Sequence, residues 1–227
     1  MALNIVERID NRVAVRHALI SVSDKTGLDT LIPALLQAAP GIKIFSTGGT
    51  YAAIERILGN NAAEVLTQVS DYTGQPEMQG GLVKTLDFKI YLGLLSETYN
   101  SAHQTDLQRL AALPIDLVIV NLYPFREAVA KADATPESGR TNIDIGGPCM
   151  IRAAAKNYLR VAAVTDPTDY PALTAELAAN NGTLELATRA RLMRKAFAHT
   201  AAYDNAIAAY FSKTADAALA ACYTSAN

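Results

Sequence analysis

The stretch NIDIGGPCMIRAAAKN, residues 142–157, decides the expected fold because it joins an acid, a glycine turn, a helix start and a lysine. Its first residues are typical of the end of an extended run, and the pair Gly146-Gly147 frees the backbone to turn. Pro148 suits the first position of a helix, and the alanine-rich run after it favours a helix that continues to Lys156. The stretch therefore predicts a strand end, a turn and a helix in succession.

Two charged side chains of this stretch are candidate functional groups. Asp144 is expected just before the helix N-terminus, and Lys156 near the helix C-terminus. Each position also has a purely structural explanation, because an acid stabilises the N-terminal end of the helix dipole and a cation stabilises its C-terminal end. Taken alone, the stretch is weak evidence for a functional site.

The composition is that of a globular protein that can bury a substantial core. Half of the 227 residues are hydrophobic, and 20 lysines and arginines nearly balance 22 acids, which argues against a nucleic-acid or anionic-membrane surface. Apolar runs are shorter than a membrane span. The N-terminus has no secretory pattern, so Cys149 and Cys222 are expected to be reduced thiols in a cytoplasmic protein. The three histidines are scattered, and no metal site is expected.

Short apolar runs alternate with helical patterns, which predicts an α/β fold with a parallel sheet and helices on both faces. Residues 1–16 are expected to be a flexible leader, residues 17–168 the α/β domain, and residues 169–227 a C-terminal helical extension packed on that domain. The expected strands lie at residues 18–20, 42–45, 64–69, 115–122 and 161–164. Loops are expected at residues 70–81 and 135–141, and one long helix at residues 189–211.

Two of the expected strands end in small polar turns that lead into helices. The first turn lies in SVSDKTGL, residues 21–28, and the second is STGGT, residues 46–50. Ordinary helix capping would explain either turn alone. Both turns are expected at the carboxyl edge of the sheet, however, where helix N-termini bind phosphate. Neither turn has the Walker spacing or a dinucleotide fingerprint, so a nucleoside triphosphate or a nicotinamide cofactor is not expected.

Further polar side chains are expected at the same edge. The most hydrophobic strand ends in Asn121 and Tyr123, an amide and a phenol. Tyr123 also fits an amphipathic surface aromatic. Lys84 follows a glycine pair, a position where a lysine is usually a solvated surface charge.

Eight blocks of the sequence together resemble the inosine monophosphate (IMP) cyclohydrolase domain of the bifunctional purine-biosynthesis protein that also carries a formyltransferase. In chain order they are SVSDKTGL, STGGT, VSDYTG-x-PEM-x-GG, VKTL, IDLVIVNLYPF, NIDIGGP, RAAAKN and AFAHTAAYD, and the resemblance covers roughly residues 17–211. It implies a methylglyoxal synthase-like fold and a homodimer with shared active sites. The implied enzyme converts 5-formamidoimidazole-4-carboxamide ribonucleotide (FAICAR) into IMP and water, with no cofactor. Because the formyltransferase domain normally follows the last block, we expect cyclisation without formyl transfer.

Matching motifs carry the family's functional positions onto this chain. Its nucleotide-binding positions fall on Ser23, Asp24, Lys25, Thr47, Gly48, Gly49, Thr50, Lys84, Thr85, Val120, Asn121, Asp144 and Ile145. Its proposed catalytic groups fall on Lys84, Tyr123, Asp144 and Lys156. Asp144 is expected to orient the attacking carboxamide, and Lys84, Asn121 or Tyr123 to stabilise the formyl oxygen. Which lysine or tyrosine donates the proton stays open.

The chain departs from the family pattern at three places. Leu82 stands where an arginine is usual, Asp87-Phe88 replaces His-Pro, and Tyr91-Leu92 replaces a common His-Gly pair. Losing the arginine removes a bidentate anion clamp, so a phosphate would depend more on Lys25 and on backbone amides. We interpret the chain as a divergent member with the same chemistry.

Two function classes stay open at this point. One is the cyclohydrolase, and the other is a nucleotide- or phosphate-sensing module of the same fold, as in the regulatory domain of carbamoyl phosphate synthetase. The presence of all four catalytic groups favours the enzyme, and the NLYPF and RAAAKN blocks disfavour methylglyoxal synthase itself. A helix from Pro148 to Lys156 would be roughly 12 Å long, so Lys156 is expected to approach the site of a partner subunit.

Overall fold

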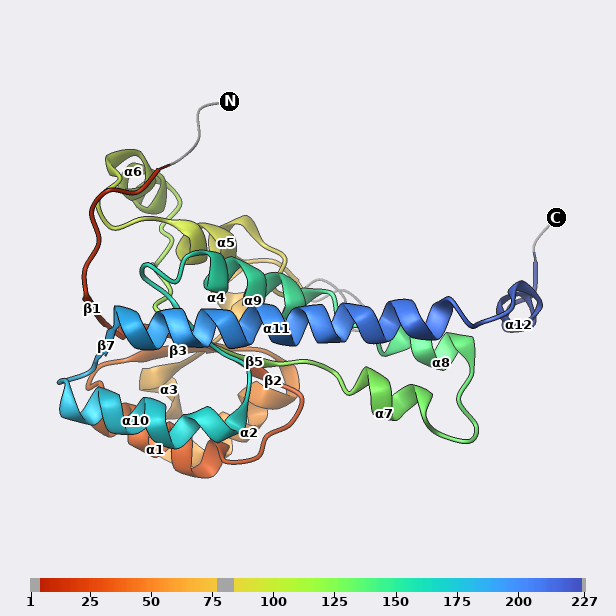
Figure 1. Cartoon of the computed structure of the whole chain (residues 1–227). Helices are drawn as coiled ribbons and strands as arrows, with labels where there is room; N and C mark the ends of the chain where they lie inside the picture. Colours follow the sequence, from red (N-terminus) through yellow and green to blue (C-terminus); the bar gives the residue numbers. More distant parts are fainter. Residues whose placement is uncertain (1–4, 77–83, 226–227) are drawn as a thin grey trace.

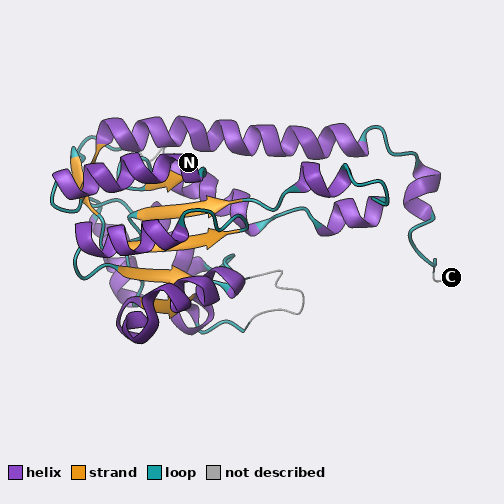
Figure 2. Cartoon of the chain, turned by 90° about the horizontal axis from the view of Figure 1, so that it is seen from below, coloured by secondary structure: helices purple, strands orange, loops and turns teal. Residues whose placement is uncertain are grey.

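A five-stranded parallel sheet forms the centre of the protein (Figures 1 and 2). The computed structural model describes residues 5–76 and 84–225. The strand order is β4-β3-β2-β5-β6. The strands are β2 (His17–Val22), β3 (Lys43–Ser46), β4 (Leu66–Gln68), β5 (Leu117–Asn121) and β6 (Ala162–Val164). All five overlap the predicted strands, and their apolar sequences fit strands buried on both faces.

Helices cover both faces of this sheet, as predicted. Along β5, Leu117 and Ile119 belong to one core cluster, while Val118 and Val120 belong to the other. The first core contains side chains of α1 (Leu28–Ala38), α2 (Gly48–Leu58) and α10 (Tyr170–Ala179). The second contains side chains of α5 (Phe88–Leu95) and α9 (Gly146–Lys156). The long helix α11 (Leu186–Phe211) contacts β6 and contributes to both cores.

The C-terminal half of α11 extends beyond the sheet into an arm, which also contains α7 (Phe125–Val129), α8 (Pro136–Thr141) and the short α12 (Asp216–Ala220) (Figures 1 and 2). Phe125 joins the arm to the sheet domain, because it follows β5 and packs against three aromatic rings of α11. Their centroids lie 5.8–6.5 Å from that of Phe125, and the rings belong to Tyr203, Tyr210 and Phe211. The C-terminal helical extension is thus confirmed, and its arm begins beside the end of β5.

The N-terminal segment departs from the expected flexible leader. Strand β1 (Arg12–Ala14) pairs antiparallel with β7 (Thr183–Glu185), and Val15 is buried. The guanidinium of the buried Arg189 donates hydrogen bonds to carbonyl groups of both segments, among them those of Asn11 and Leu184. Residues 12–16 are therefore part of the fold.

Several short elements differ from the expected ones. The expected loop at residues 135–141 contains α8, because Thr135 and Ser138 form a capping box and Pro136 occupies the first helical turn. Residues 142–145 are a loop rather than a strand end, and α9 begins at Gly146, two residues before Pro148. The expected loop at 70–81 starts within α4 (Val69–Thr73), and its residues 77–81 lie outside the described part of the chain. Within residues 5–76 and 84–225 the other helices are α3 (Ala62–Val65) and α6 (Ser101–Arg109), with 3-10 turns η1 (Gly59–Asn61) and η3 (Pro167–Asp169).

Candidate functional site

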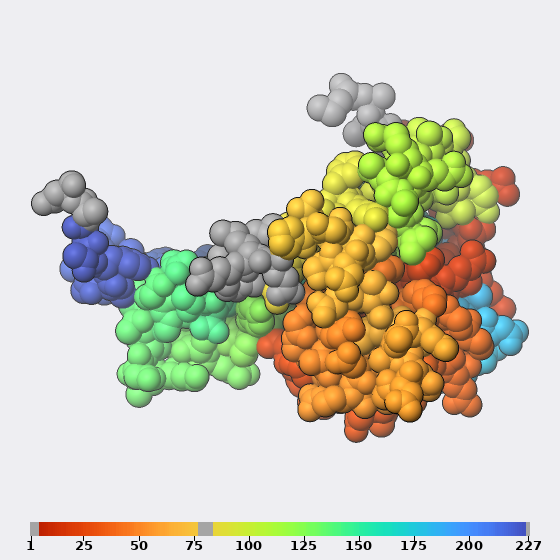
Figure 3. Space-filling model, turned by 180° about the vertical axis from the view of Figure 1, so that it is seen from behind, coloured from red at the N-terminus to blue at the C-terminus, as the bar shows by residue number. Residues whose placement is uncertain are grey.

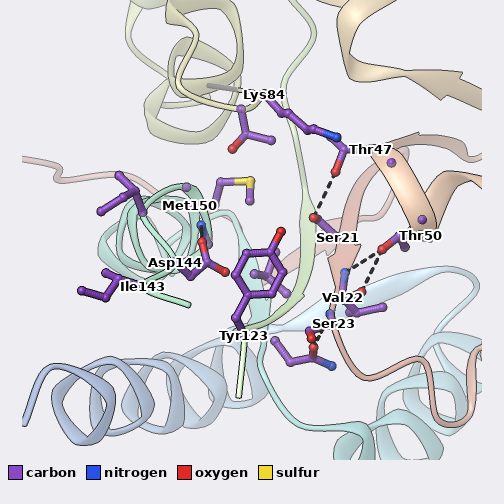
Figure 4. A pocket seen from close by; sticks show the side chains of 18 of the residues that line it. Ser21, Val22, Ser23, Thr47, Thr50, Lys84, Tyr123, Ile143, Asp144 and Met150 are labelled. Atoms are coloured by element: carbon purple, nitrogen blue, oxygen red, sulfur yellow. Dashed lines mark hydrogen bonds between the residues drawn. The ribbon is translucent and has the colours of Figure 1, made fainter. Parts of the chain in front are cut away.

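A cavity of about 280 Å³ opens at the carboxyl edge of the sheet, between the ends of β2, β3 and β5 and the start of α9 (Figure 4). Figure 3 shows the surface of the molecule from the side opposite to that of Figure 1. Thirteen of the fifteen predicted site residues line the cavity: Ser23, Lys25, Thr47, Gly48, Gly49, Thr50, Lys84, Thr85, Val120, Asn121, Tyr123, Asp144 and Ile145. The structure thus brings residues from five sequence blocks to one place.

The STGGT turn is held against β2 by two buried hydroxyl groups. The Ser46 hydroxyl donates to the carbonyl of Ile20 (2.7 Å), and the Thr50 hydroxyl both accepts from the N–H and donates to the carbonyl of Val22 (3.0 Å each). These bonds fix the start of α2 relative to the end of β2. The main role of Thr50 is therefore to hold the start of α2 against the end of β2, although this residue also lines the cavity.

Two lysine ammonium groups flank the N-terminus of α2. A Cβ atom added to Gly48 would lie 3.1 Å from Nζ of Lys84, and one added to Gly49 would lie 3.8 Å from Nζ of Lys25. Gly48 also has a φ of +48°, which favours glycine. A helix N-terminus attracts anions, and here two cations strengthen that field. This end of the cavity is suited to a phosphate group.

The first turn is held by Asn121 at the end of β5. The Asn121 Oδ1 accepts hydrogen bonds from the N–H groups of Ser23 (2.6 Å) and Asp24 (2.9 Å), and its Nδ2 donates to the carbonyl of Asp24 (2.8 Å). The amide oxygen and one amide N–H of Asn121 thus hold the turn in place, which gives this side chain a positioning role. The Asp24 carboxylate accepts from the N–H and the hydroxyl of Thr26, and these hydrogen bonds lower the pKa of Asp24. Asp24 is not among the cavity-lining residues.

A partly buried carboxylate lies on the other side of the cavity. Oδ1 of Asp144 accepts a hydrogen bond from the N–H of Gly147 (2.8 Å), which explains why α9 begins before Pro148. Burial raises the pKa of the Asp144 carboxyl, while hydrogen bonds from the backbone N–H groups of Gly147 and Tyr123 oppose that change. Figure 4 shows Asp144 beside the Tyr123 ring, whereas Lys84 points toward Thr47. The cavity therefore combines an anion-binding end with a desolvated carboxylate.

Lys156 lies outside this cavity. It is exposed at the last position of α9, so ten helical steps of about 1.5 Å place it roughly 15 Å along the axis from Gly146. Leu82, where an arginine was expected, lies outside the described residues. Asp87, another departure, is the N-cap of α5, because its Oδ1 accepts from the N–H of Lys89 (2.7 Å). This replacement thus has a local structural role.

Seven residues that line the cavity were not predicted as site residues from the sequence: Ser21, Val22, Thr141, Ile143, Gly146, Gly147 and Met150. Ser21 lies within the SVSDKTGL block, and its hydroxyl is 3.2 Å from that of Thr47, so the strand ending was a usable signal. Ile143 likewise lies within the NIDIGGP block, whereas Thr141 had no such signal because α8 was not predicted. Tyr203 was also missed, although its hydroxyl contacts the backbone of the Asp144 loop.

Gly147→Ala is expected to destabilise the protein and displace Asp144. A Cβ atom here would lie 2.6 Å from both the Asp144 carboxylate and Cδ2 of Leu122. Overpacking of this kind costs about 1–3 kcal/mol, which corresponds to a fall in Tm of roughly 2–12 °C for a chain of this size. Gly49→Ala is the comparison, because its Cβ would lie 3.8 Å from the Lys25 side chain, an ordinary van der Waals contact. Thermal unfolding of both variants checks the prediction, and equal Tm values would contradict it.

The described residues contain no group of three or more His, Cys, Asp or Glu that could hold a metal ion. Within the same residues, no helix is long and apolar enough to cross a bilayer.

Comparison with known proteins relates the two halves of the chain to two family models. The model described as MGS-like domain matches residues 32–149, and the one described as AICARFT/IMPCHase bienzyme matches residues 154–226. The Bifunctional purine biosynthesis protein PurH of a Synechococcus species is 45% identical over 200 residues, which are 88% of this chain and 37% of that protein. PurH of Neisseria meningitidis serogroup A is 47% identical over 203 residues, 89% of this chain and 37% of that protein. The chain thus spans little more than a third of these relatives.

A solved structure has a similar fold. The crystal structure of ForH superposes with a TM-score of 0.71 at 31% sequence identity, and the match covers 86% of this chain and 98% of that chain. The likeness therefore extends beyond the MGS-like region into the helical extension.

Proposed function

The chain belongs to the MGS-like domain family, and from this premise we propose that it is an IMP cyclohydrolase of purine biosynthesis. Its substrate would be FAICAR, and its products IMP and water. One observation carries the proposal: a single cavity has a helix N-terminus flanked by two lysines at one end and a desolvated carboxylate beside a phenol at the other. Conversion of FAICAR into IMP by the purified protein tests it.

The nucleotide would bind with its phosphate at the start of α2. Lys25 and Lys84 supply positive charge there, and the turn carrying Ser23 is held in place by Asn121. A phosphate at this position leaves the heterocycle to extend toward Asp144 and Tyr123 across the cavity. The family resemblance assigns both binding and catalytic roles to Lys84. The position of its ammonium group beside Gly48 supports the binding role.

The reaction itself makes limited demands on the protein. The carboxamide nitrogen attacks the formyl carbon of the same molecule, so that a C–N bond forms and the formyl C=O becomes the C–OH group of a carbinolamine. Loss of this hydroxyl group together with the proton of the formamido nitrogen then forms a C=N bond and releases water. Because the reacting groups are already joined, the site mainly has to select the productive rotamer and move protons. Asp144 would accept the carboxamide proton, and its burial makes the carboxylate a stronger base than an exposed aspartate. Tyr123 would donate a proton to the departing oxygen.

Replacing Lys25 by alanine is expected to weaken IMP binding about 10- to 100-fold, because a charge-assisted hydrogen bond contributes roughly 1.5–3 kcal/mol. Binding of inosine, which has no phosphate, should change little. Lys43→Ala is the matched control, since Lys43 begins β3 at the opposite edge of the sheet. Calorimetric titration with both ligands checks the prediction. Equal losses for IMP and inosine would show that Lys25 does not contact the phosphate.

We further propose that the protein is a cytoplasmic homodimer with shared sites. Lys156 is too far along α9 to meet a nucleotide held beside Asp144 of its own chain. Tyr123 and Ile145, at the cavity, are 52% and 54% exposed, and a second subunit would cover such apolar surface. In a two-fold dimer the Lys156 end of one α9 would approach the partner's cavity.

A further inference from the structure

One hydroxyl group of the C-terminal extension holds the loop that carries Asp144. Tyr203 lies in α11, and its hydroxyl accepts a hydrogen bond from the Asp144 N–H (2.9 Å) and donates one to the Asn142 carbonyl (3.1 Å). The same oxygen therefore joins two residues of the short connection between α8 and α9. Tyr203 does not itself line the cavity.

The backbone and the side chain of Asp144 are thus held by different groups. Its backbone is bound by the Tyr203 hydroxyl, and its carboxylate by the N–H of Gly147 (2.8 Å) in the first turn of α9. The loop between α8 and α9 has no partner strand to fix it, since residues 142–145 are not part of the sheet. Loss of the hydroxyl would leave an N–H and a carbonyl group of this loop without those bonds.

Tyr203 is well placed to act as a fixed support. Its ring packs edge-on against Phe125, with centroids 6.3 Å apart and an interplanar angle of 70°. Burial is the main cause of the raised pKa of Tyr203. The hydrogen bond from the Asp144 N–H opposes this change, whereas the charges of Asp144, Asp204 and Tyr123 act in the same direction as burial. The phenol therefore stays protonated at neutral pH and can donate to Asn142 while it accepts from Asp144.

We propose that Tyr203 is a positioning residue for the cyclisation, which sets the place of the Asp144 carboxylate by holding the backbone of its loop. This inference rests on the proposed function. It assigns to the helical extension a part in a site whose other residues come from the preceding α/β domain.

The test compares Tyr203→Phe with Tyr210→Phe. Tyr210 lies on the same helix and packs on the same Phe125 ring (5.8 Å), so its loss of a hydroxyl is the matched control. For Tyr203→Phe we expect kcat to fall about 10- to 100-fold with KM within about threefold, the effect of a misplaced reacting group. We expect Tyr210→Phe to change neither constant.

A second readout needs no turnover. The carboxyl of Asp144 is titrated by carbon-13 NMR, with Asp144→Asn used to assign its signal. In Tyr203→Phe the loosened loop admits water, so the pKa of Asp144 should fall toward the ordinary aspartate value, because burial is what raises it. Tyr210→Phe should titrate as the unchanged protein does.

The outcomes separate this inference from the proposed function. If the wild-type protein forms no IMP, the proposed function is refuted. If the Asp144 titration is nevertheless altered in Tyr203→Phe and not in Tyr210→Phe, the positioning role of Tyr203 is supported. A folded Tyr203→Phe protein with unchanged kcat and an unchanged Asp144 titration overturns the positioning. If Tyr203→Phe does not fold, Tyr203→Met, which also has no group to replace the hydroxyl, takes its place in both measurements and the same results decide.

Discussion

Replacing Asp144 by asparagine is expected to lower kcat about 10²- to 10⁴-fold, the usual contribution of a general base, while the Kd for IMP changes by less than about threefold. The amide keeps the shape of the side chain but cannot take a proton from the carboxamide. Asp106→Asn is the control, since Asp106 lies in α6 and pairs with the exposed Arg109 (2.9 Å). Steady-state kinetics with FAICAR and calorimetry with IMP provide the two constants.

The pH dependence follows from the burial of the same carboxyl group. Its pKa is raised, so activity should be lost as the pH falls through a value above the ordinary 3.8. The sign for stability is opposite: a raised folded-state pKa means that the protonated form is favoured by folding, and this contribution disappears as the pH rises through that pKa. At neutral pH, Asp144→Asn should therefore be at least as stable as the unchanged protein. A marked fall in Tm together with the loss of activity would contradict this account of Asp144.

An equally large effect is expected when two inactive variants are mixed. If Lys156 serves the partner's site, Asp144→Asn and Lys156→Ala are each nearly inactive, but in their mixed dimer one site collects both defects and the other neither. Random exchange of subunits should then restore about a quarter of the native activity. Activity before and after exchange is compared, with the exchange verified by native mass spectrometry.

The contrary result has a clear meaning. If mixed dimers form and no activity returns, Lys156 serves its own chain's site or none. Its place at the end of α9, where a cation stabilises the helix dipole, would then be a sufficient explanation for it.

The sheet could be predicted because its strands are continuous apolar runs that end in small polar turns. The parallel order then brings those turns to one edge, which is why Ser23, Gly48 and Asn121 were expected near one another and line one cavity. Local pattern thus predicted that these turns meet at one edge, since strand polarity leaves only one edge for them.

The parts that could not be predicted depend on contacts between residues distant in sequence. Strand β1 is three residues long and is recognisable only through its pairing with β7, about 170 residues later. The Tyr203 hydroxyl is about 60 residues from the loop it binds. Tyr203 lies within the AFAHTAAYD block, but nothing in the helical pattern of α11 indicates this contact. Sequence also does not reveal that Asn121 holds the first turn, with an amide oxygen that accepts two backbone hydrogen bonds.

The most direct test of the proposed function is to incubate the purified protein with FAICAR, without added cofactor, and follow the formation of IMP. We expect IMP to form far faster than in buffer alone, one IMP to appear for each FAICAR consumed, and Asp144→Asn to remove the acceleration. Tight binding of IMP with no formation above the uncatalysed rate would contradict the account, and would identify the cavity as that of a nucleotide-sensing module.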